Sequence, residues 1–175
     1  MNKTTTYILA VIAIIIVGGA FYFYNGRIPA NIGGNDNTPA TSATAYQNTQ
    51  YGFSVSLPAS WAGYTVVMDT WKGDSLDANG NMTQGTVSGP FISIRNPLWT
   101  AADPHQDIPI YVFTIQQWND MQADKFHIGA APINPSELAR NANYVFALPA
   151  RYNFAYQTGY EEVQQVIDAK SVTAF

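Results

Sequence analysis

The segment Asp103-Pro-His-Gln-Asp107 places two carboxylates around one of the chain's two imidazoles. An imidazole beside carboxylates can hold a metal ion or act as a general base. The other histidine, His127, lies in a different segment without a paired metal-ligand spacing, and the chain has no cysteine to complete a zinc site. We therefore interpret the segment as a solvated loop and predict no catalytic residue, metal site or cofactor. A small metal-dependent or hydrolytic enzyme centred on Asp103, His105 and Asp107 is the alternative.

A second segment resembles the start of a calcium-binding loop, because Asp77, Asn79 and Asn81 alternate like the first ligands of an EF-hand. Met82 stands where that loop requires glycine, and Ser88 where it requires a bidentate glutamate. The Asn-Gly pair inside the segment instead favours a hairpin turn, since both residues accept a positive φ. The chain also has no Gly-x-Ser-x-Gly elbow and no phosphate-binding glycine loop, so nucleophilic and nucleotide chemistry are not indicated.

Aromatic side chains offer a better case for binding. They make up 14% of the chain against 11% for charged residues, and Tyr and Trp dominate recognition surfaces. In an extended Arg151–Tyr156 segment, three rings would share one face. The predicted binding surface comprises Trp99, Trp118, Arg151, Tyr152, Phe154 and Tyr156. Packing of the same rings in the core is the competing interpretation.

Apolar periodicity predicts the strands that position these side chains. Residues 50–57 alternate large apolar with small polar side chains, which is typical of a half-buried strand. Residues 108–115 form a nearly continuous apolar run, which predicts a central strand covered on both faces. Further strands are expected at 64–71, 86–95 and 143–148, with a short edge element at 171–175. His127 is expected to be a partly buried strand residue.

Two helices are expected. Residues 116–125 lack Gly and Pro and place Trp118 and Met121 on one inner face. Residues 160–167 carry two glutamates in the first turn, where they suit the helix dipole, and an apolar stripe at Val163, Val166 and Ile167. The sum is an α+β domain, a mostly antiparallel β-sheet flanked by helices.

A membrane segment is predicted in front of this domain. Residues 7–24 are uncharged and reach roughly 27 Å as a helix, close to the ~30 Å apolar core of a bilayer. Small residues at Gly18 and Ala20 leave cleavage as a secretory signal open. We favour a retained signal anchor, because aromatic residues extend the run and suit the membrane boundary. The anchor residues are Tyr7, Ile8, Leu9, Ile12, Ile15, Ile16, Phe21, Tyr22, Phe23 and Tyr24.

This anchor divides the chain into parts. Residues 1–6 are predicted to be a short cytoplasmic tail, 25–44 a flexible polar tether, and 45–175 one extracytoplasmic domain. The predicted location is the cell membrane, crossed once. The part beyond Arg27 has six basic and twelve acidic residues, a formal charge of −6, which disfavours nucleic acid as a partner.

Three segments carry a resemblance to a known family. The run Tyr51-Gly-Phe-Ser-Val-Ser-Leu-Pro-Ala-Ser-Trp61, an aromatic-rich strand followed by Pro-x-x-Trp, resembles the start of bacterial domains similar to the photosystem protein PsbP and the Ran-binding protein Mog1. Phe91–Pro97 and Tyr160–Ile167 look like the inner strand and closing helix of its small membrane-anchored members. The resemblance implies a PsbP/Mog1-like fold over most of residues 46–175. It implies no activity, because such relatives bind photosystem subunits, a small GTPase or envelope partners.

The sequence therefore predicts a membrane-anchored extracytoplasmic binding or assembly module without a catalytic role. Its expected partners are the membrane, through one helix, and another envelope protein. No small-molecule ligand is indicated. A self-associating structural surface subunit is a further alternative.

Overall fold

A computed structural model describes residues 44–130 and 133–175. The predicted cytoplasmic tail, the signal anchor at residues 7–24 and all but the last residue of the predicted tether lie outside the described residues. Within those ranges, no helix combines the length and the apolar character needed to cross a membrane.

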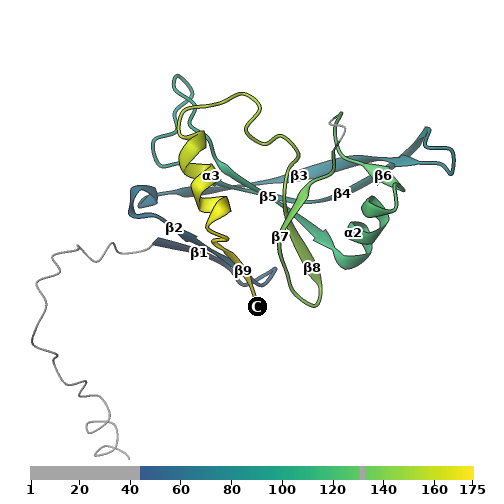
Figure 1. The fold of residues 1–175 in the computed structure, drawn as a ribbon, viewed down its shortest axis with the longest axis horizontal. Coiled ribbons are helices and arrows are strands. Elements are labelled where there is room, and N and C mark those ends of the chain that lie inside the picture. The colour runs from purple at the N-terminus through teal and green to yellow at the C-terminus, as the bar shows by residue number, and fades with distance from the viewer. Residues whose placement is uncertain (1–43, 131–132) are drawn as a thin grey trace, which may run out of the picture. The chain divides into compact units, whose positions relative to one another are not determined.

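The larger of two antiparallel sheets has six strands (Figure 1). Their order across the sheet is β6 (Phe126–His127), β3 (Thr65–Leu76), β4 (Met82–Arg95), β5 (Ile108–Thr114), β8 (Tyr144–Leu148) and β7 (Ser136–Arg140). Figure 1 shows the tip of the long β3–β4 hairpin projecting past β6. The sheet is therefore built mainly from neighbours in sequence, with β5 near its centre.

The smaller sheet has three strands, and β2 (Phe53–Leu57) lies in its middle. Its neighbours are β1 (Thr44–Asn48) and β9 (Val172–Ala174), both antiparallel to it. Three helical segments complete the described structure: the 3-10 turn η1 (Ala59–Trp61), α2 (Ile115–Gln122) and α3 (Tyr160–Asp168). The predicted α+β class is confirmed.

The six-stranded sheet is covered on both faces, so the domain has two cores. The first core lies between one face of this sheet, β2 and α3, and includes Phe53, Ile110, Phe146 and Val163. The second lies between the opposite face and α2, and includes Phe113, Trp118 and other rings. Neighbouring residues of β5 alternate between the two cores, which explains why this strand reads as a continuous apolar run.

Local sequence accounts for the two α-helices. Thr114 caps α2: its hydroxyl accepts the Gln117 N–H, and the Gln117 side chain accepts the Thr114 N–H in return. Helix α3 begins after Gly159, whose φ is 84°, with Glu161 and Glu162 in its first turn. Val163 and Val166 are buried as predicted, and Ile167 packs against the first core.

The hairpin interpretation of the calcium-like segment is also supported. One carboxylate oxygen of Asp77 accepts the backbone N–H groups of Asn79 at 2.8 Å and Asn81 at 2.9 Å. Gly80 adopts a φ of 78°, the conformation that its lack of a side chain allows. The carboxylate thus closes the β3–β4 turn from inside.

The structure differs from the sequence prediction in two strands and in the number of sheets. Strand β1 includes Thr44, which had been assigned to the tether, and it was not predicted because Tyr46 is its only buried residue. Strand β7 was missed because its sequence, Ser-Glu-Leu-Ala-Arg, shows no apolar alternation and pairs irregularly with β8. His127 does lie in a short strand, β6, and is half-buried as expected. The strands also divide into two sheets rather than one.

Candidate functional site

The structure keeps two residues of the candidate catalytic segment in contact and places the third elsewhere. The His105 imidazole Nε2 lies 3.3 Å from the Asp103 carboxylate. Asp107 turns away and accepts hydrogen bonds from the Arg95 guanidinium at 3.2 Å and the Asn96 backbone N–H at 3.1 Å. Across residues 44–130 and 133–175, no group of three His, Asp or Glu side chains is close enough to hold a metal ion. The segment therefore does not bring its three titratable side chains together at one point.

The same segment also connects two long loops to each other. The loop after β4 contacts the loop before α3. The Gln106 N–H donates to the Thr158 carbonyl at 2.8 Å, and His105 and Thr158 form an isolated parallel β-bridge. Asn96 is buried and accepts the Leu98 N–H at 2.9 Å. The loop that carries the predicted aromatic row therefore has a fixed base.

That row is folded into consecutive turns and is not extended. The Phe154 N–H donates to the Arg151 carbonyl, and the Tyr156 N–H donates to the Asn153 carbonyl, each at 3.0 Å. Arg151 and Tyr156 adopt φ values of 52° and 48°. The left-handed conformation costs a non-glycine residue roughly 1–2 kcal/mol. The surrounding contacts must offset this cost, so they define the loop's conformation.

The turns divide the three rings between the core and the surface. Tyr152 packs against the first core, donates its hydroxyl to the Gln164 side chain at 2.7 Å, and has a pKa raised first by burial and then by Asp168. Phe154 and Tyr156 are 76% and 69% exposed. We call residues 151–156 the aromatic loop. The rings do not share one face as the extended segment would have required.

Two further aromatic residues were predicted to join this surface. Trp118 is only 7% exposed and packs edge-on against Phe113 in the second core, so it is removed from the candidate surface. Trp99 is half-buried, with the Arg95 guanidinium 4.0 Å above its ring. That stacking also orients Arg95 toward Asp107. Trp99 remains accessible, but as part of the loop after β4.

One aromatic neighbour of the aromatic loop was not predicted from the sequence. Tyr160, the first residue of α3, meets the Tyr156 ring edge-on at 5.2 Å between centroids. A four-residue spacing would have suggested this contact only if both residues had been helical. Tyr156 instead reaches Tyr160 from a left-handed turn just before the helix.

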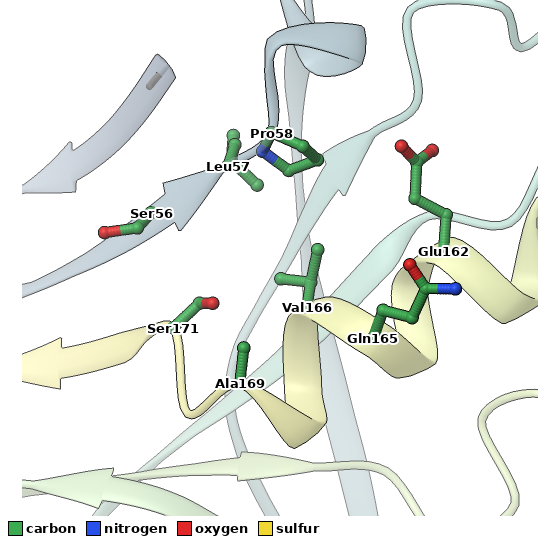
Figure 2. Close-up of a pocket in the computed structure, with 8 residues that line it drawn as sticks. All are labelled: Ser56, Leu57, Pro58, Glu162, Gln165, Val166, Ala169 and Ser171. Atoms are coloured by element: carbon green, nitrogen blue, oxygen red, sulfur yellow. The ribbon is translucent and has the colours of Figure 1, made fainter. Parts of the chain in front are cut away.

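A groove of about 310 Å³ lies between the end of β2 and α3 (Figure 2). Leu57, Pro58 and Val166 give it an apolar lining. The Glu162 carboxylate at its edge accepts the Ser60 hydroxyl. Such a groove suits an apolar side chain of a ligand better than a charged substrate. Sequence periodicity gave no sign of it, because the groove forms only where β2 meets α3.

No protein-family model matches this chain, and no curated protein or solved structure is detectably similar to it. The features of the described residues that bear on function are therefore the aromatic loop, the two connected loops at its base and the groove beside α3.

Proposed function

We propose that the protein is a membrane-anchored extracytoplasmic binding module that docks on another envelope protein through its aromatic loop. The observation that carries the proposal is the exposure of the Phe154 and Tyr156 rings on a loop whose backbone is fixed. A large ring left in water forgoes roughly 1.5–3 kcal/mol of burial free energy, which a partner surface can recover.

Rigidity adds to the argument. The base of the loop is held by the hydrogen bond between Gln106 and Thr158, and its middle by the hydrogen bond between Tyr152 and Gln164. A ligand surface that is already ordered loses less conformational entropy on binding. Arg151 is exposed beside the rings, and aromatic residues with arginine are the types that dominate binding hot spots.

The finer assignment of fold and location belongs to the same proposal. The aromatic strand with Pro58 and Trp61, and the closing helix from Tyr160, support a PsbP/Mog1-like domain. The uncharged run at residues 7–24 supports a single-pass anchor with the domain outside the cytoplasm. We propose no catalytic role, and the engagement of Asp107 by Arg95 supports this.

Photo-crosslinking from the full-length chain in its native membrane tests the proposal. A photoreactive residue replaces Phe154, Tyr156 or, as a control, the exposed Gln84 near the hairpin tip. We expect one discrete adduct of the same mass from positions 154 and 156 and none from position 84.

Competition makes the test specific. Unlabelled wild-type chain should suppress the adduct, whereas a chain with Phe154→Ala and Tyr156→Ala should not. The absence of an adduct, or equal labelling from Gln84, would overturn the proposal. An adduct with the mass of two copies of this chain would point instead to a self-associating subunit.

A further inference from the structure

Within residues 44–130 and 133–175, one strand of the larger sheet has a long edge that is mostly unpaired. Along Thr65–Gly73, β3 pairs with β4 on one side, and β6 joins its other side only at Asp74 and Ser75. The other edge strands of the described sheets are shorter: β1 and β7 have 5 residues each, β9 has 3 and β6 has 2. Short edges resist pairing with other chains, whereas a long straight one invites it.

Two observations show which backbone groups of β3 face outward. Thr70 lies opposite Pro90, which has no N–H to donate. The Thr70 N–H is instead taken by the neighbouring Asp69 carboxylate at 2.7 Å. Because backbone direction alternates along a strand, the N–H and C=O groups of Val66, Met68 and Thr70 point toward the free edge.

Two apolar side chains on this edge are partly uncovered. Val66 and Met68 are 38% and 54% exposed, although their cross-strand partners Ile94 and Ile92 are fully buried in the first core. Asp69 and Lys72 are the exposed charged residues of this segment, but other usual protections of an edge are missing from it. Thr65–Gly73 contains no proline, and its irregular pairing with β4 begins only beyond Asp74.

We propose that this edge binds a second copy of the chain, forming an antiparallel β3–β3 pair with its two-fold axis at Met68. Met68 then faces the same residue of the other copy, and Val66 faces Thr70. The outward backbone groups satisfy one another in both directions, as an isologous contact requires. The surface differs from the aromatic loop, so the inference does not rest on the proposed docking function.

Charge allows this register, and exposure favours it: among the registers that keep like charges apart, only an axis at Met68 sets the most exposed apolar side chain of β3 against its own copy. A two-fold axis at Asp69 or at Lys72 would set a charge against its own counterpart, which is unfavourable across a strand pair. With the axis at Met68, Asp69 faces Val67 and Lys72 faces Tyr64, so no like charges meet. The Asp69 carboxylate must release the Thr70 N–H, which makes Asp69 the one group that opposes pairing.

The lack of native cysteine allows a direct test on the full-length chain. Residues directly opposite in an antiparallel pair have Cα atoms about 5.5 Å apart, within the range of a disulfide. Under mild oxidation, Met68→Cys should therefore form a covalent dimer. Thr70→Cys alone should not, because each copy of that residue faces Val66 of the other.

Two further variants complete the experiment. Mixing Val66→Cys with Thr70→Cys chains should restore crosslinking between the two different chains. Asp69→Ala should raise the dimer fraction measured by sedimentation in detergent, because it frees the Thr70 N–H. The absence of a disulfide in Met68→Cys, or equal crosslinking from Met68→Cys, Thr70→Cys and Gln84→Cys, would overturn the inference. Loss of the photo-adduct at Phe154 would leave it intact.

Discussion

Strands β5 and β3 have opposite surroundings. Both are rich in β-branched and aromatic residues, yet β5 is paired on both sides and covered on both faces, whereas much of β3 is paired on one side and exposed. The difference arises within β3 itself. Its Trp71 enters the second core and donates its indole N–H to the Val112 carbonyl at 2.9 Å, while Val66 and Met68 lie outside. The exposure of Val66 and Met68 therefore depends on the position of β3 in the sheet and not on their apolar character alone.

The strongest test of this difference between the two strands is to truncate one apolar side chain in each. Ile110→Ala in β5 removes a fully buried side chain and should lower the free energy of unfolding by about 2–5 kcal/mol. Val66→Ala in β3 should change it by about 0.5 kcal/mol or less. Urea denaturation at low protein concentration measures both, and equal losses would mean that β3 is not an open edge.

A second test concerns the half of β3 that is packed. A Cβ added at Gly89 would lie 2.6 Å from the Trp71 ring, which its hydrogen bond to Val112 holds in place. Gly89→Ala should therefore cost about 1–3 kcal/mol through overpacking. The matched change Gly85→Ala first meets the Ser75 hydroxyl, a small group that can rotate away, and should cost less. Thermal unfolding compares them, and a reversed order would contradict this account.

A third test concerns the end of β5, where Thr114 also caps α2. Thr114→Ala removes the hydroxyl that accepts the Gln117 N–H, and should destabilise the domain by about 1 kcal/mol. Thr114→Ser keeps the hydroxyl and should retain most of the stability. If the serine variant loses as much as the alanine variant in urea titrations, the cap does not stabilise the helix.

The smallest expected effect lies at the far end of β3, where Asp77 closes the hairpin. The Asn81 backbone N–H, the Asn81 side chain and the Asn79 N–H hold the pKa of this carboxyl below its ordinary value of 3.8. Ionised Asp77 therefore stabilises the turn above pH 3.8, and that contribution is lost as the pH falls through the lowered pKa. Asn81→Ala should raise the pKa part of the way, as NMR titration of the carboxyl carbon would show. Asn79→Ala keeps its backbone N–H and should leave it unchanged.

The sequence predicted elements whose signals are local. The continuous run at residues 108–115, the Asn-Gly turn and the helix with Trp118 and Met121 on its inner face all have physical causes within a few residues. The two-sheet arrangement was not predictable in this way, because β2 pairs with β9 at the other end of the described chain. Strands β1 and β7 pair with the next strand along the chain, but their own sequences show too little apolar alternation to predict them. Exposure of the open edge is likewise a property of the assembled sheet.

The candidate site was predicted less well, for a reason visible in particular residues. The aromatic row was assumed to be extended, but the left-handed conformations of Arg151 and Tyr156 have no sequence signal comparable to glycine. The inner-face position predicted for Trp118 was confirmed, and it conflicts with the role of that residue in a binding surface. A helix residue at three-residue spacing from another apolar residue belongs to the core unless a partner is known.

The pairing of β2 with β9 also sets the order in which parts of the domain can fold during synthesis. Ser54 and Thr173 share a hydrogen bond across 119 residues of sequence, so the smaller sheet cannot close before β9 has left the ribosome. The β3–β4 hairpin needs no such wait, since its strands are joined by a short turn. Contacts between distant segments slow folding because the intervening chain loses entropy when the loop closes. During synthesis, the edge strand β3 is therefore available well before the first core is complete.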